Sequence, residues 1–310
     1  MPRRLRFQPS KDMIHVVSMR CMQGFSFLKP SSTMNVVIAG VLGRALAHFE
    51  SSIKLYTYVF MSNHYHMILQ AEDHQALSKF MQYFNQNLSR ELSHLHEWKH
   101  HFWQTRYASH LVLDEEALVS QFKYVLSNSV KEGLVRHPQL WPGLHCYSKI
   151  VERKKIRGQW LDRTGLYNAR RSKKNQSWGE EHFILDYEIQ LSRPDCWAHL
   201  SQEAYREMIR QWTKEICETH KGQGFAGVKK VLDAEVYTKR KPKGGVRPLC
   251  KAGCVQLWIE FKKMYRAFRT QYYLASHHYH EACDICYGDE LIEARSLYPQ
   301  GGFIHGFVPT

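Results

Sequence analysis

Asn63, His64, Tyr65 and His66 are the consecutive residues of this chain whose types are best suited to chemistry. Residues two apart in an extended strand point to the same face, so His64 and His66 would project side by side while Tyr65 faces away. Two imidazoles on a rigid strand supply half of the ligands that a divalent metal ion needs. A single His-x-His pattern also occurs without any function, so the other half of a site must come from elsewhere.

Tyr124 and Asn128 are the second candidate pair. They fall in a segment with helical periodicity, and a spacing of four residues places a phenol and an amide on one helix face. A tyrosine hydroxyl can act as a covalent nucleophile, and an amide oxygen is a suitable ligand for Mg²⁺ or Mn²⁺. The alternative is an ordinary helix with one aromatic core residue and one polar asparagine.

These pairs need a scaffold, and the hydrophobic pattern indicates one. Alternating or β-branched segments predict strands, and apolar residues at helical spacing predict helices. Strands are expected at 13–21, 55–69 (two stretches in one) and 106–113, and helices at 35–49, 75–98 and 115–132. We therefore expect an α+β fold of the ferredoxin-like type, an antiparallel sheet with helices on one face.

Several motifs carry a resemblance to a known family. They are residues 15–18 (HVVS), 58–69 (YVFMSNHYHMIL), 102–107 (FWQTRY) and 124–135 (YVLSNSVKEGLV). In order and spacing they resemble the single-tyrosine HUH transposases, specifically the REP-associated tyrosine transposase group of insertion-sequence transposase-like proteins. The resemblance covers about residues 1–150. One position departs from the pattern, because Ser129 stands where the family has a proline that helps to shape the helix turn.

The resemblance implies an HUH endonuclease fold and a reaction. A divalent metal ion, Mg²⁺ or Mn²⁺, would be held by His64, His66 and Asn128 and would grip a phosphate of single-stranded DNA. Tyr124 would attack it, which gives a 5′-phosphotyrosine link that can later be rejoined. Hairpin-forming palindromic repeats are the implied target. Two alternatives stay open: a domesticated DNA-binding protein without productive transposition, and an HUH replication or conjugation nickase, which usually has a third histidine or paired tyrosines.

The charge of the chain fits a nucleic-acid partner. The formal net charge is +14, of which +6 falls in residues 1–150 and +8 in residues 151–310. Such an excess favours a polyanion, because phosphate contacts release counterions. Candidate DNA contacts lie near the presumed site and in a basic loop: Arg20, Arg106, Lys123, Lys131, Lys239, Arg240, Lys241, Lys243 and Arg247.

Composition also bounds the location and assembly. No apolar run reaches the roughly 20 residues of a membrane span, and the eight irregularly spaced cysteines favour reduced thiols. We therefore expect a cytoplasmic protein, a monomer or homodimer, with no membrane partner.

A composition change after Ile150 predicts two domains, 1–150 with the transposase motifs and 151–310 as a basic accessory domain. The second is expected to be mostly helical, with helices at 202–220 and 255–275, and to bind DNA. It also holds Cys250, Cys254, Cys283 and Cys286, which could bind zinc together with His277, His278 and His280, or could be free thiols. The second His-Tyr-His, at 278–280, follows a helical run and is expected not to share a strand face.

Overall fold

The computed structural model describes residues 5–172, 179–239 and 248–285 of the 310-residue chain. Its centre is a five-stranded sheet in the order β2-β3-β1-β4-β7. The strands are β1 (Met13–Arg20), β2 (Ile53–Phe60), β3 (His64–Ala71), β4 (Ala108–Val112) and β7 (Cys250–Lys251). The first four pair antiparallel, and β7 adds to the edge of β4 in parallel.

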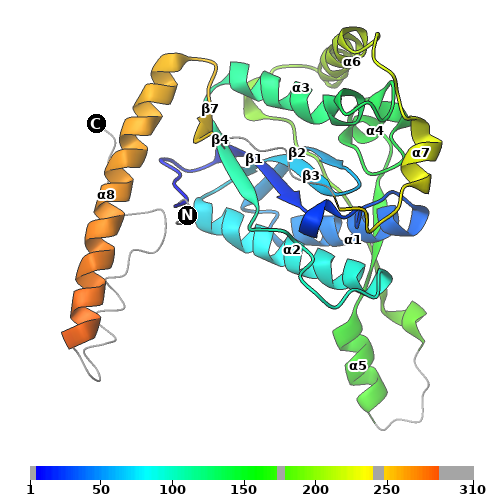
Figure 1. Cartoon of the computed structure of the whole chain (residues 1–310), viewed down its shortest axis with the longest axis horizontal. Coiled ribbons are helices and arrows are strands. Elements are labelled where there is room, and N and C mark those ends of the chain that lie inside the picture. The colour runs from blue at the N-terminus through cyan, green and yellow to red at the C-terminus, as the bar shows by residue number, and fades with distance from the viewer. Residues whose placement is uncertain (1–4, 173–178, 240–247, 286–310) are drawn as a thin grey trace.

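Helices cover both faces of this sheet (Figure 1). Helices α1 (Ser32–His48) and α2 (His74–Leu95) lie on one face, and α3 (Glu115–Lys131) lies on the other. The strand β3 shows this alternation, since Tyr65 donates a hydrogen bond to Asn85 of α2 while the ring of His66 contacts Tyr124 of α3. The two faces therefore have different roles, one in the core and one at the candidate site.

The expected α+β class is confirmed, and the element order β1-α1-β2-β3-α2-β4 with sheet order 2-3-1-4 is the ferredoxin-like arrangement. The two helices of that unit share one face, as predicted. The prediction of helices on one face only was wrong for α3, because α3 has its own buried stripe, including Leu118, Phe122 and Val125, and it covers the second apolar face of the sheet.

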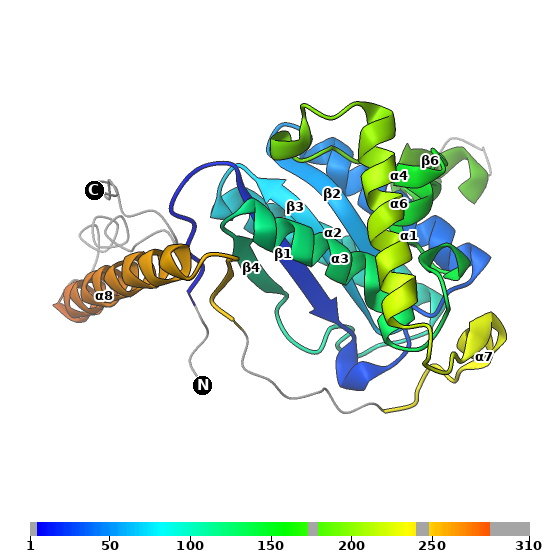
Figure 2. The same cartoon turned by 90° about the horizontal axis from the view of Figure 1, so that it is seen from above.

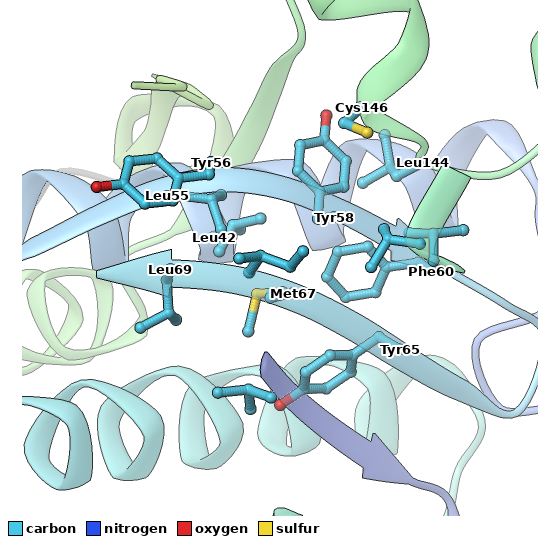
Figure 3. Packing of buried hydrophobic residues seen from close by; sticks show 14 of the residues in the cluster. Leu42, Leu55, Tyr56, Tyr58, Phe60, Tyr65, Met67, Leu69, Leu144 and Cys146 are labelled. Atoms are coloured by element: carbon cyan, nitrogen blue, oxygen red, sulfur yellow. The ribbon is translucent and has the colours of Figure 1, made fainter. Parts of the chain in front are cut away.

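Large aromatic and aliphatic side chains fill the core between β2, β3 and the helices (Figure 3). In Figure 3, Tyr65 points from β3 toward α2, beside Phe60 and Met67. The Tyr65 hydroxyl reaches Asn85 Oδ1 at 2.6 Å, so this fully buried phenol has its hydrogen bond satisfied. Tyr65 is thus a core residue, as its position between the two histidines predicted.

The rest of the chain packs around this unit (Figure 2). Its elements are α4 (Cys146–Val151), β5 (Arg157–Leu161), α5 (Arg163–Arg171), β6 (Ile184–Glu188), α6 (Gln202–Thr219), α7 (Gly227–Asp233) and α8 (Val255–Ile285). Short 3-10 turns occur at Met22–Gly24, Pro138–Leu140, Glu180–Phe183 and Asp195–Trp197. Helix α6 packs on α3, and the hairpin of β5 and β6 packs on α1. The second half of the chain therefore contains three strands as well as helices. Strand β7 joins the central sheet and β5 pairs with β6, and the sequence predicted none of these three strands.

Backbone contact joins α1 to the β5 strand. A Cβ atom on Gly40 would lie 2.1 Å from the backbone oxygen of Gln159, and one on Gly158 would lie 2.1 Å from the backbone nitrogen of Gly40. Only glycine allows a helix and a strand to approach so closely at these two positions. The two glycines therefore fix the hairpin to the first helix.

Helix α8 lies beside the N-terminal segment at one end of the molecule (Figures 1 and 2). It is attached through a small aromatic cluster in which Phe7 stacks on Phe268 at 4.9 Å and contacts Phe261 at 5.6 Å. Despite its length, α8 has too many polar residues for a bilayer, and no helix in the described part of the chain is long and apolar enough to cross a membrane.

Candidate active site

His64 and His66 lie at the N-terminal end of β3, opposite the C-terminal end of β1. Strand β1 pairs with β3 so that Arg20 is opposite His64 and Ser18 is opposite His66. The two imidazole rings lie 5.0 Å apart between centroids, on the face covered by α3. The expectation that both histidines share one face therefore agrees with their geometry.

Helix α3 brings the tyrosine to these histidines. It begins at the N-cap Asp114, whose side chain accepts a hydrogen bond from the Ala117 amide at 2.7 Å. Two and a half turns later, the Tyr124 ring lies 5.2 Å from the His66 ring. Asn128, one turn further along, is almost fully buried and interacts with the side chains of both Tyr124 and His64. All four residues thus meet, although they come from separate elements.

The serine at the position of the family's proline leaves the helix intact. Ser129 is fully buried inside α3, which continues to Lys131, and Gly133 with a φ of +68° ends the helix. The carbonyl of Ser129 accepts hydrogen bonds from the amides of Leu134 and Val135. Asn128 therefore keeps its place beside the histidines without the proline.

Burial sets the ionisation of the site. Desolvation lowers the pKa of His64 to about 4, with a further decrease from Arg20 that the Asn128 side chain opposes. Desolvation also lowers the pKa of His66 well below its ordinary value, helped by His64 and Lys131. Both imidazoles are therefore neutral at pH 7, which is the state that a metal ligand requires. Burial raises the pKa of Tyr124, so its phenol is protonated at rest.

The site opens into a cavity of about 710 Å³ that carries excess positive charge. Arg20, Arg106 and Lys230 line it, and Glu132 is the acidic residue among the described lining residues. Tyr124 is 36% exposed and is therefore accessible from this side. An anionic group such as a phosphodiester would be attracted to the cavity and could reach the phenol.

Several lining residues were not predicted. Two of them are Gln104 and Thr105. The backbone amide of Gln104 donates a hydrogen bond to the carbonyl of Arg20 at 3.0 Å, which holds this segment beside the end of β1. Lys230 comes from α7, so the second half of the chain closes one wall of the cavity. Gln104 belongs to a motif that the sequence had shown, whereas nothing local to Lys230 indicates that it approaches His64.

The predicted DNA contacts divide into three groups. Arg20 and Arg106 line the cavity, and the ammonium group of Lys131 lies 5.1 Å from the centre of the Tyr124 ring. Lys123 is not brought to the site, because its ammonium group pairs with Glu215 of α6 at 2.6 Å. Lys239 is exposed and outside the cavity lining, and the other predicted contacts of the basic loop lie outside the described residues: Arg240, Lys241, Lys243 and Arg247.

The donor set fits a divalent metal ion in its chemistry. Asn63 Oδ1 lies 2.7 Å from His64 Nδ1, and since the Asn63 amide group donates to Gly24, His64 Nδ1 carries the proton and Nε2 keeps a lone pair. His66 Nδ1 is buried with no hydrogen-bond partner among the described residues. In the part of the chain that the structure describes, no three His, Cys, Asp or Glu side chains form a metal cluster, and the side chain of Asn128 interacts with that of His64.

The second set of candidate ligands is spread over the length of α8. Cys254 precedes α8 and Cys283 lies near its other end, and a continuous helix separates them by roughly 40 Å at 1.5 Å per residue. The backbone of α8 therefore does not bring Cys254 and Cys283 together, and zinc binding by either cysteine pair stays a prediction. Cys286 lies outside the described residues, and His278 and Tyr279 lie on the helix, so the second His-Tyr-His does not share a strand face.

Comparisons with known proteins agree with the motifs. Residues 39–128 match the family described as "Transposase IS200 like", a range that includes His64, His66, Tyr124 and Asn128. Over these residues the match agrees with the resemblance to insertion-sequence transposases. No curated protein gives a significant match.

The solved structures that are similar to the chain include two transposases. One is a REP-associated tyrosine transposase bound to a REP hairpin, with 15% identity, a TM-score of 0.39, and coverage of 62% of this chain and 100% of that one. The other is described as a transposase from Deinococcus radiodurans R1, with 12% identity, a TM-score of 0.29, and coverage of 40% of this chain and 94% of that one.

Proposed function

We propose that this protein is a metal-dependent single-stranded DNA endonuclease and transposase that acts through a covalent tyrosine intermediate. The observation that carries the proposal is the meeting of three side chains at the wall of a cationic cavity: the Tyr124 ring lies 5.2 Å from the His66 ring, which lies 5.0 Å from the His64 ring. The family match over the same residues supports it. Hairpin-forming repeats are the proposed DNA, in keeping with the hairpin in the similar transposase structure.

The chemistry assigns a role to each group. The phosphate enters the cavity beside Arg20 and Arg106, which balance its charge. A divalent ion held by His64, His66 and Asn128 would supply further neutralisation of the phosphate. The Tyr124 oxygen forms a bond to phosphorus and the bond to the 3′ oxygen breaks, with the phenol losing a proton and the 3′ oxygen gaining one. The products are a 5′-phosphotyrosine and a free 3′-hydroxyl, so rejoining needs no nucleotide cofactor.

The second half of the chain is proposed to be an accessory region that holds the DNA. Its net charge of +8 and the position of Lys230 on the cavity wall support this role. The boundary near residue 150, the cytoplasmic location and a monomeric or dimeric state remain parts of the same proposal.

The test is covalent trapping. The protein is incubated with a labelled single-stranded hairpin and Mn²⁺, and an adduct that resists denaturation is scored. Tyr124→Phe should abolish the adduct and leave DNA binding intact, whereas Tyr167→Phe, at an exposed tyrosine of α5, should change neither. An adduct that persists in Tyr124→Phe would disprove the role of this residue.

The same assay separates the alternatives. Hairpin binding without any adduct in the wild type would favour the domesticated DNA-binding protein. A replication or conjugation nickase is less well supported, because α3 carries Tyr124 as its single tyrosine.

A further inference from the structure

A second cavity adjoins the candidate active site, and we call it the arginine pocket. It has a volume of about 620 Å³ and lies between the N-terminal segment, β4 and α8, three parts that Figures 1 and 2 show side by side. Arg6 and Phe7 come from the N-terminal segment, Tyr107 precedes β4, and Phe261 and Tyr265 come from α8. Residues from both ends of the chain thus build one cavity.

The pocket contains an arginine without a counter-ion in the described structure. The Arg6 guanidinium lies 3.5 Å from the centre of the Tyr107 ring, and its Nη1 atom is buried with no hydrogen-bond partner among the described residues. Burial, and secondarily Arg106, lowers the pKa of Arg6 to about 9. None of the described residues that line the pocket is acidic. A partly buried cation without a counter-ion is costly, and an anionic ligand would reduce that cost.

The remaining walls suit the other parts of a nucleotide. The Tyr107 hydroxyl is buried with no hydrogen-bond partner in the described part of the chain, so it can donate to a phosphate oxygen beside Arg6. Phe7 and Tyr265 are partly exposed and, backed by the buried Phe261, form an aromatic wall on which a base can pack. His15 lines the pocket too, but both of its ring nitrogens are already engaged, by Ser109 and Gln8.

The arginine pocket adjoins the active-site cavity along one segment. Gln104, Thr105, Arg106 and Ala108 line both. His15 of the arginine pocket and the His64–His66 pair lie on opposite faces of the sheet, so a strand whose phosphate lies beside Tyr124 would reach the second cavity by passing around this shared segment.

We propose that the arginine pocket binds one nucleotide of the single-stranded DNA that occupies the active site, with Arg6 and the Tyr107 hydroxyl on its phosphate and the aromatic wall against its base. This inference rests on the proposed function, because it takes single-stranded DNA as the substrate.

The test measures binding apart from cleavage. Fluorescence anisotropy of the full-length protein with a labelled oligonucleotide of about a dozen nucleotides is recorded with EDTA at several salt concentrations. Arg6→Gln should weaken binding ~10-fold and reduce the salt slope by about 0.7, the value for one phosphate contact on a single strand. Arg6→Lys should keep most of the slope, since it keeps the charge. Tyr107→Phe should weaken binding while leaving the slope unchanged.

Arg44→Gln is the matched control, because it removes the same charge from an arginine of α1 that lies over the Trp160 ring of β5, outside both cavities. It should leave the affinity and the slope near the wild-type values. If Arg6→Gln lowers the unfolding temperature but not the salt slope, Arg6 has a structural role and the inference is wrong.

Two further arms separate other outcomes. In one arm, the binding of a labelled mononucleotide is compared between the wild type and Arg6→Gln. If mononucleotide binding depends on Arg6 and oligonucleotide binding does not, the pocket binds a free nucleotide and the inference is wrong. The adduct assay with Tyr124→Phe is run in parallel. If the wild type forms the adduct and Arg6→Gln leaves DNA binding unchanged, only the inference about the pocket is rejected. If DNA binding depends on Arg6 but the wild type forms no adduct, the pocket is supported and the proposed enzyme activity is not.

Discussion

Acidification should destabilise this protein through His15, a buried histidine in β1. His15 is 4% exposed, its Nδ1 lies 3.0 Å from the Ser109 hydroxyl, and its Nε2 lies 2.9 Å from Gln8 Oε1. Desolvation lowers its pKa to about 3, with smaller contributions from Arg6 and His74. In the unfolded chain the pKa of a histidine is about 6.5.

The direction and size follow from these two values. Below pH 6.5 the unfolded chain binds a proton that the folded protein refuses until about pH 3, so the free energy of unfolding decreases as the pH falls through this window. Above pH 6.5 both states are neutral and the effect vanishes. Between pH 7 and pH 5 the loss from this one group is about 2 kcal/mol.

The assay is urea unfolding of the wild type and His15→Gln at pH 7 and pH 5. Other buried histidines add to the pH dependence of both proteins, so the informative quantity is the difference between the two decreases in unfolding free energy. We expect the decrease to be about 2 kcal/mol smaller in His15→Gln. His48→Gln, at an exposed histidine near the end of α1, is the control and should behave like the wild type. Equal decreases in the wild type and His15→Gln would refute the reasoning.

Three other predictions concern the scaffold and the site. Gly158→Ala should lower the unfolding free energy by about 2–4 kcal/mol in chemical denaturation, because the added Cβ would lie 2.1 Å from the α1 backbone. The control is Gly222→Ala, which should have little effect because nothing lies within 4 Å of its added Cβ. Equal losses of unfolding free energy in the two variants would contradict this prediction. Ser129→Ala should raise the unfolding free energy by about 1 kcal/mol, because it removes a fully buried hydroxyl with no hydrogen-bond partner in the described structure. A decrease in the unfolding free energy, measured by the same denaturation, would show that the hydroxyl has a partner. The double variant His64→Ala and His66→Ala, like the wild type in EDTA, should give no DNA adduct but still bind the hairpin in metal-free anisotropy; adduct formation by that variant would exclude these histidines as essential ligands.

Much of the first half of the chain could be predicted because the signals there are local. Strand alternation placed His64 and His66 on one face, and helical spacing placed Tyr124 and Asn128 one turn apart. The N-cap Asp114 and the terminal Gly133 bound the helix that carries the tyrosine. The predicted bounds of this helix, 115–132, differ from the observed Glu115–Lys131 by one residue.

Less could be predicted in the second half. The hairpin of β5 and β6 depends on contact with Gly40, more than 100 residues away, and β7 consists of two residues that pair only because β4 offers an open edge. Neither leaves a periodic pattern in its own sequence, and the charge clusters around 152–174 obscure what pattern there is. Short strands of this kind form through their partners rather than through local propensity.

The sequence by itself determined which groups could react: two imidazoles on a strand, and a phenol with an amide on a helix, each pair held within a few residues of chain. Only the tertiary structure decided that the pairs meet, because α3 crosses the face of the sheet opposite to α1 and α2 and brings Tyr124 to His66. It also decided which charges surround them. Lys123 pairs with Glu215, Lys230 is brought to the cavity wall, and Arg6 lies over the Tyr107 ring in a pocket that a helix some 250 residues away helps to line. The physical reason is that periodicity specifies the face of one element, whereas the meeting of faces depends on packing between elements.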